Sequence, residues 1–327
     1  MIRRRLCLGA AAIALTVPLT GCVTVHGERA LIPSTRPAEA AKVLADFVRQ
    51  NNKAKRAYDE HTIASVESGP LGAIDQAAMR AKHANSPQGN PRAGALVLSG
   101  QKFFIPEQRG WPKFFVAEAT SNVDGDTRWL LAFRRSAPDQ PWKAGFLCLA
   151  APDELPDFAV DKHGYAEPVP SAGTDLLAQP GQLSTLYAQY LDADQGASGT
   201  SVFADGTATS GLRAVRRNNQ RTANTVTQYL DQGAVDGDFA PVALRTKDGG
   251  AAVFFGSRHQ SRSTFRVGYR LDLDQETQAL TIGTPRTSIT LSQVAQEMVT
   301  VPPASRRGSA KVVFVSRLQG LVSAQGQ

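Results

Sequence analysis

The order of apolar and polar positions after residue 36 predicts helices first and strands afterwards. Apolar side chains recur at helical spacing from Ala40 to Tyr58, with Pro37 in the first turn. Shorter helices are predicted at residues 60–67 and 71–84, where Gly-Pro and Asn-Ser-Pro sequences provide stops. The apolar runs that follow are brief and bounded by turn residues, so they predict strands at residues 95–98, 102–105, 113–120, 129–133 and 142–149.

The second half of the chain repeats this order. A segment rich in Pro, Asp, Ala and Gly at residues 152–180 predicts a linker, and helical spacing returns at residues 183–191. Residues 196–211 are rich in Gly, Ser, Thr and Asp and predict a loop. Lys247-Asp248-Gly249-Gly250 predicts a hairpin turn, within a series of strands expected at residues 240–245, 251–255, 265–273, 278–282, 288–301 and 311–322.

Helices followed by strands indicate the α+β class, here as two tandem helix-then-antiparallel-sheet domains at residues 36–151 and 181–325. This element order resembles the nuclear-transport-factor-2-like cone, in which a long helix packs into a bent sheet around an apolar hollow. An unrelated α+β arrangement is the alternative. The resemblance implies a hollow lined by residues such as Phe47, Phe104, Phe115 and Trp129, and the other interpretation of these aromatic residues is a simple packed core.

The first residues predict export. Arg3, Arg4 and Arg5 precede an apolar run of about fourteen residues, which is shorter than the roughly twenty needed to cross a bilayer. Leu19, Thr20, Gly21 and Cys22 then form a lipobox. We therefore predict a signal peptide at residues 1–21 and a membrane-proximal tether at residues 22–35. A plain secretory signal is the alternative, and the choice between the general and the twin-arginine export route stays open.

The lipobox resembles that of bacterial lipoprotein precursors, and this resemblance implies a diacylglyceryl group on the sulfur of Cys22. Four further segments resemble a family of actinobacterial envelope lipoproteins of uncharacterised function, at residues 19–28, 72–77, 237–246 and 317–321. The resemblance implies a lipid-anchored protein at the outer face of the cytoplasmic membrane. It brings no known reaction, substrate or catalytic residue.

Charge indicates which partners to expect. The formal net charge is +7, of which three charges leave with the predicted signal peptide, so the mature chain carries about +4. This excess of positive charge favours contact with anionic lipid headgroups or wall polymers. The sequence lacks the basic stripe with stacking aromatic residues that nucleic-acid binding requires. A solvated surface is the simpler interpretation of the candidate contacts, which are Arg213, Arg216, Arg217, Arg221, Arg258, Arg262 and Arg266.

The sequence contains neither a G-x-S-x-G nucleophile motif nor a glycine-rich phosphate-binding loop. The five histidines lack metal-ligand spacing and are expected at the surface, so no metal or cofactor is predicted. Cys148 lies in an apolar run and is expected to be buried and inert. Acidic pairs such as Asp124 with Asp126, and Asp236 with Asp238, are more typical of turns than of a glycosidase. We expect a non-enzymatic protein with a binding or scaffolding role. The alternatives are capture of a small apolar ligand, or an envelope hydrolase with an unrecognised acid pair.

Overall fold

The computed structural model describes residues 30–192, 202–308 and 310–327. The first half begins with the helices α1 (Pro37–Ala57), α2 (Glu60–Ala64) and α3 (Gly69–Asn85). An antiparallel sheet follows in the order β2-β4-β5-β6. Its strands are β2 (Leu98–Phe104), β4 (Lys113–Ser121), β5 (Arg128–Arg135) and β6 (Lys143–Ala150). A separate two-stranded ladder joins β1 (Ile32–Pro33) to β3 (Glu107–Gln108).

The second half contains a larger sheet in the order β10-β12-β11-β9-β7, with β8 also paired to β9. All neighbours are antiparallel except β10 and β12. The strands are β7 (Thr225–Ala234), β8 (Val242–Arg245), β9 (Ala251–Phe265), β10 (Thr281–Ile282), β11 (Ser288–Val301) and β12 (Val313–Gly326). The helices of this half are α4 (Leu183–Asp192), α5 (Leu212–Gln220) and α6 (Gln275–Ala279).

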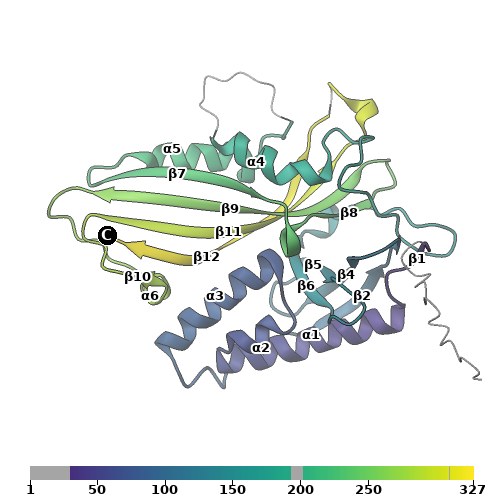
Figure 1. The fold of residues 1–327 in the computed structure, drawn as a ribbon, viewed down its shortest axis with the longest axis horizontal. Helices are drawn as coiled ribbons and strands as arrows, with labels where there is room; N and C mark the ends of the chain where they lie inside the picture. Colours follow the sequence, from purple (N-terminus) through teal and green to yellow (C-terminus); the bar gives the residue numbers. More distant parts are fainter. Residues whose placement is uncertain (1–29, 193–201, 309) are drawn as a thin grey trace, which may run out of the picture.

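The elements form layers, with α1–α3 on one side of the molecule and α4 and α5 on the other (Figure 1). Helix α1 buries Ala40, Leu44 and Phe47, which recur at helical spacing and pack on the four-stranded sheet. Strand β4 lies in the middle of that sheet and is buried on both faces. Its unbroken apolar run from Phe114 to Ala117 follows from this double cover.

The face of the four-stranded sheet that points away from α1 packs against the large sheet. Phe146 and Cys148 of β6 belong to the same apolar cluster as Phe254 of β9 and Met298 of β11. The ring centroids of Phe146 and Phe254 are 6.3 Å apart. In addition, the Leu147 N–H donates to the Gln296 side chain at 2.7 Å. The two halves therefore share a hydrophobic core.

The α+β class is confirmed, whereas the separation into two tandem domains and the cone-like shape of each half stay predictions. The aromatic residues proposed to line a hollow lie in packed surroundings. Phe115 stacks on Phe133 at 4.9 Å, and Phe47 meets the same ring edge-on at 5.8 Å. Trp129 belongs to the same buried cluster, and Phe104 packs on Phe158 on the other side of the sheet. These side chains are part of the cores.

Several predicted elements differ from the observed ones. Residues 95–98 and 102–105 are not two strands but contribute to β2, which contains a bulge between Ser99 and Lys102. No strand spans residues 265–273, because β9 ends at Phe265 and the chain turns. Residues 278–282 hold the end of α6 and the short β10. Both α5 and β7 were missed, since their polar sequences lack a clear apolar period.

The shared core predicts that the two halves unfold together. All three tryptophans, Trp111, Trp129 and Trp142, lie in the first half, whereas Phe254 is 1% exposed in the second. We expect Phe254→Ala to lower the free energy of unfolding by about 3–5 kcal/mol and to shift the denaturation midpoint followed by tryptophan fluorescence. Val267→Ala is the control, because Val267 is 99% exposed. An unchanged tryptophan transition in Phe254→Ala would mean that the halves unfold independently.

Candidate functional site

Six polar side chains meet on the face of the large sheet that α4 and α5 cover. We call Arg216, Asp231, Ser257, His259, Glu297 and Arg317 the polar cluster. The strand register assembles it, because Asp231 of β7 lies opposite His259 of β9, and Glu297 of β11 lies opposite Arg317 of β12. Ser257 is two residues before His259 on the same strand, so both point to one face. Ser257, His259 and Glu297 are almost completely buried.

Asp231 is the anion at one end of the cluster. It accepts a hydrogen bond from Arg216 Nη2 at 2.9 Å and another from the His259 ring. Burial alone would raise the pKa of this carboxyl, but the bonds from His259 and Arg216 lower it to about 2. Arg216 also stacks on the Tyr229 ring at 4.9 Å. This buried ion pair attaches α5, which has no buried residue of its own, to β7.

His259 is held neutral between two guanidinium groups. Burial lowers its pKa, Asp231 opposes the shift, and Arg317 and Arg216 add to it. Since Asp231 is ionised and only accepts, the Nδ1–H of His259 donates to it. Arg317 Nη2 lies 3.2 Å from His259 Nε2, and a guanidinium only donates, so the lone pair of Nε2 accepts this bond.

Ser257, His259 and Asp231 form a chain that has the composition of a hydrolytic triad. Ser257 Oγ lies 2.8 Å from His259 Nε2, yet it donates its single proton to Glu297 Oε1 at 2.6 Å. The hydroxyl is also 0% exposed. A nucleophile needs a base that accepts its proton and a path for the substrate. In this geometry Ser257 instead orients Glu297.

Glu297 and Arg317 connect the polar cluster to the molecular surface. Burial raises the pKa of Glu297 to about 7, although Arg317 and Ser257 favour the charged form. The Arg317 Nε atom lies 3.6 Å from Glu297 Oε1, and the arginine side chain is 13% exposed. The guanidinium groups of Arg216 and Arg317 thus face three carboxyls. Asp231 is ionised, burial raises the pKa of Glu297 to about 7, and burial together with the neighbouring Asp231 raises the pKa of Asp192 to about 6.

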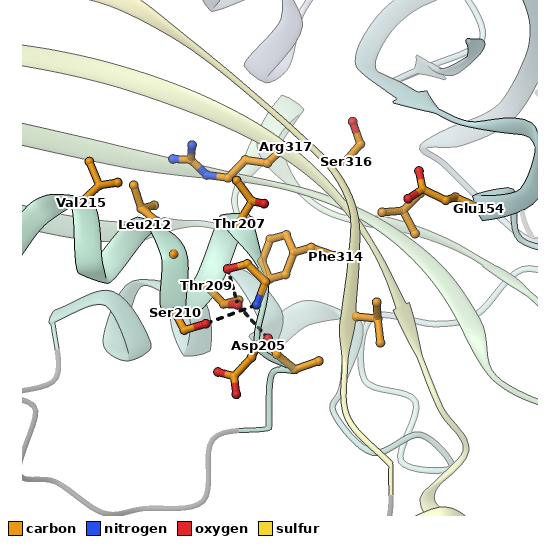
Figure 2. A pocket seen from close by; sticks show the side chains of 16 residues that line it. Glu154, Asp205, Thr207, Thr209, Ser210, Leu212, Val215, Phe314, Ser316 and Arg317 are labelled. Atoms are coloured by element: carbon orange, nitrogen blue, oxygen red, sulfur yellow. Dashed lines mark hydrogen bonds between the residues drawn. The ribbon is translucent and has the colours of Figure 1, made fainter. Parts of the chain in front are cut away.

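Arg317 borders a pocket of about 760 Å³ between β12 and the segment that precedes α5. Figure 2 shows Thr209 and Ser210 facing Phe314, while the Arg317 side chain extends toward Leu212 and Val215. Glu154 and Asp205 are exposed at its rim. The pocket thus combines apolar side chains, hydroxyl groups and one guanidinium, with two carboxylates at its rim.

A π-helical segment, Thr207–Gly211, forms one wall of this pocket. The Thr209 hydroxyl donates to the Ala204 carbonyl at 2.7 Å, and the Gly206 N–H donates to Ser210 Oγ at 3.3 Å (Figure 2). Tyr187 of α4 is buried beneath and donates its hydroxyl to the Ala208 carbonyl at 2.6 Å. These bonds fix the wall, so the pocket is a preformed feature.

The arginines singled out in the sequence do not come together. Arg216 belongs to the polar cluster, Arg213 stacks on Tyr190, and Arg217 and Arg221 are exposed on the same side of the large sheet. Arg258 and Arg262 of β9 alternate with His259 and therefore point to the opposite face, where Arg258 stacks on Phe239. Arg266 is exposed just beyond β9. Their contact with an anionic surface stays a prediction.

The expectation that all histidines are at the surface is wrong for His259, which is 1% exposed. The available signal was the alternation of Ser257, His259, Ser261 and Ser263 after an apolar strand, which marks one polar face of a longer β9. His61, His83 and His163 are exposed. Cys148 is buried as predicted, and burial raises the pKa of its thiol to about 12.

The predicted signal peptide at residues 1–21 lies outside the described residues. The lipobox, Leu19, Thr20, Gly21 and Cys22, falls there too, as does most of the tether. Within the described ranges, no helix combines the length and apolarity required to cross a bilayer. The same ranges hold no group of three or more His, Cys, Asp or Glu side chains arranged for a metal ion.

Known proteins resemble this chain over almost its full length. Residues 32–326 match the model of a family described as Domain of unknown function (DUF8094). Uncharacterized lipoprotein SCO2278 of Streptomyces coelicolor is 42% identical over 98% of this chain and 94% of its own length. An uncharacterized lipoprotein of Streptomyces avermitilis is 40% identical over 97% of this chain and 94% of its own length. The predicted resemblance to actinobacterial lipoproteins is thereby confirmed. No solved structure matches.

The raised pKa of Glu297 predicts a pH-dependent stability difference. Between about pH 4.5 and 7 the folded protein holds a proton on Glu297 that the unfolded chain has released, so this group's stabilising contribution falls as pH rises. Relative to Glu297→Gln, the wild type should lose on the order of 3 kcal/mol of unfolding free energy between pH 5 and pH 8. Urea denaturation at both pH values measures this difference.

The exposed Glu276 is the matched control, because Glu276→Gln leaves the polar cluster intact. Its difference from the wild type should be the same at both pH values. An equally flat difference for Glu297→Gln would contradict the assignment of a raised pKa to Glu297.

Proposed function

This chain belongs to the family described as Domain of unknown function (DUF8094), and on that premise we propose that it is a lipid-anchored envelope protein that binds a small ligand without chemical conversion. The membrane anchor is the diacylglyceryl group on Cys22. The binding site is the pocket between β12 and residues 204–212, which recognises a ligand with an apolar body and an anionic end.

The anchor is supported by two independent observations. The lipobox ends in Cys22 after a short apolar run, and the similar Streptomyces proteins are named lipoproteins. Two acyl chains on one sulfur give stable attachment, whereas a single chain gives only reversible attachment. An exported chain with this cysteine would therefore remain at the outer face of the cytoplasmic membrane.

The position of Arg317 is the observation that carries the binding role. Its guanidinium is oriented from behind by His259 and Glu297 and borders a pocket with apolar residues such as Phe314 and Leu212. Ligand pockets in proteins typically combine an apolar lining with a few oriented polar groups. An anionic group beside Arg317 would accept charge-assisted hydrogen bonds from its guanidinium.

The same contacts support a non-catalytic role. In the triad-like chain of Ser257, His259 and Asp231, the serine is enclosed and donates to a carboxylate. The acidic pair Asp124 and Asp126 lies at the turn between β4 and β5, with Asp124 accepting a bond from the Trp129 indole at 2.7 Å. Both arrangements have structural roles.

Fatty-acid labelling tests the anchor. Cells that express the protein and receive a fatty acid with a terminal alkyne should produce a labelled band, and Cys22→Ala should abolish the label. Cys148→Ala is the control, because Cys148 is a buried thiol that should not carry lipid. Label retained in Cys22→Ala, or a native protein released into the medium, would contradict the proposed anchor.

Occupancy of the pocket can be followed with 8-anilinonaphthalene-1-sulfonate, a probe that has apolar rings and an anionic group. The exposed Thr207 lines the pocket, so Thr207→Phe should fill part of it and weaken probe binding about tenfold. Asn218 is exposed on α5 and does not line the pocket, so Asn218→Phe should bind the probe like the wild type. Fluorescence titration measures both affinities, and equal affinities for the two variants would refute this binding site.

A further inference from the structure

A depression of about 810 Å³ lies between the outer side of α1 and the loop after α3. Four basic side chains line it, namely Arg49, Lys53, Arg56 and Arg92. None of its lining residues is acidic. None of these four residues is among the arginines that were candidates from the sequence. They lie close together because the loop after α3 folds against α1.

Four of the five basic residues of α1 form one stripe along its solvent-facing side. Lys42, Arg49, Lys53 and Arg56 are spaced by seven, four and three residues and are all exposed. Arg49 forms an ion pair with Asp46. In the parts of the chain that the structure describes, no carboxylate lies within 4 Å of Lys53, Arg56 or Arg92.

The loop after α3 forms the wall opposite α1 and is held to this helix by hydrogen bonds. The Asn90 N–H donates to the Arg56 carbonyl at 2.7 Å, and the Leu96 N–H donates to the Asn52 side chain at 2.7 Å. Gly89 has a φ of +71°, and a Cβ there would lie 2.2 Å from the Arg56 carbonyl oxygen, so this close approach requires glycine. The loop backbone is therefore held against α1, and this places Arg92 beside the α1 stripe.

We propose that this basic depression and the α1 stripe bind the anionic phospholipid headgroups of the membrane to which the protein is anchored. The inference rests on the proposed function, because the anchor brings this surface to the bilayer. The described chain starts eight residues after Cys22, a span of at most about 28 Å. Helix α1 then extends for 21 residues, about 30 Å. The tether is thus short enough for α1 to lie along the headgroups.

This orientation has a consequence for the proposed ligand pocket. Helices α1 and α4 lie on opposite sides of the layered molecule (Figure 1). With the α1 side on the membrane, the pocket between β12 and residues 204–212 lies on the α5 side and faces away from the bilayer. A ligand from the extracytoplasmic space would then reach the pocket without passing between protein and lipid.

Vesicle binding by the mature chain with Cys22→Ala tests the inference, because it removes the acyl anchor and leaves the described residues intact. We expect co-sedimentation with vesicles of phosphatidylcholine and phosphatidylglycerol in low salt, and little with phosphatidylcholine alone. Each basic residue near an anionic surface contributes about fivefold to partitioning. The triple variant Lys53→Gln, Arg56→Gln, Arg92→Gln should therefore bind about 100-fold more weakly.

A second triple variant, Arg270→Gln, Arg286→Gln, Arg307→Gln, removes the same charge from exposed positions elsewhere. It should retain most of the binding, whereas equal losses in both variants, or no binding to anionic vesicles, would overturn the proposal. Competition by soluble polyphosphate is the second arm. If the first triple loses polyphosphate binding but keeps vesicle binding, a phosphate polymer and not the membrane is the partner, and the proposal fails. Either failure leaves the lipid label on Cys22 and probe binding in the pocket unaffected, so it is distinguishable from failure of the proposed function.

Discussion

The packing of the four-stranded sheet on the large sheet is the constraint on which the rest of the structure depends. Both sheets have an apolar face that neither α1 nor α4 can cover, and the cluster around Phe146, Phe254 and Met298 removes both faces from water. The four-stranded sheet and α3 together cover the face of the large sheet that points away from α4 and α5, and α1 lies on the outer side of the four-stranded sheet. The layered order places a basic surface on α1 at one side and a pocket beneath α5 at the other.

Burying the charged side chains of the polar cluster costs free energy, and the hydrogen bonds among them offset much of this cost. Buried charges are tolerated when each is paired and hydrogen-bonded. Asp231 is bonded by Arg216 and His259, and Glu297 is bonded by Ser257 beside Arg317. In return, the cluster attaches a short polar helix to the sheet and orients Arg317 next to the pocket. A chain of Ser, His and Asp can thus orient neighbouring side chains without acting as a catalytic triad. Which of the two roles the serine has depends on the group to which it donates its proton.

The sequence pattern predicts long elements that contain many apolar residues, but it does not predict short or polar elements. Helix α1 and strand β11 were anticipated nearly to the residue. Helix α1 buries one face at helical spacing, whereas β11 has no exposed position and ends just before Pro302 and Pro303. Helix α5 and strand β7 were missed because α5 buries nothing and β7 buries only Thr227, Asp231 and Ala234. A polar residue that is buried by pairing carries no hydrophobic signal, so Asp231 could not be distinguished from a surface residue.

What the amino-acid sequence determined by itself is the likeness to actinobacterial lipoproteins, the α+β class and the burial of Cys148, because each depends on local sequence, composition or periodicity. Tertiary structure alone decided the polar cluster, the pocket and the basic depression. Asp231 and Glu297 lie 66 residues apart, and only strand register brings them onto one face of the sheet. Likewise, Arg92 joins the α1 stripe only because Gly89 lets the loop approach the helix backbone. Charge and hydrogen bonding act through space, and the order of residues along a chain does not specify those distances.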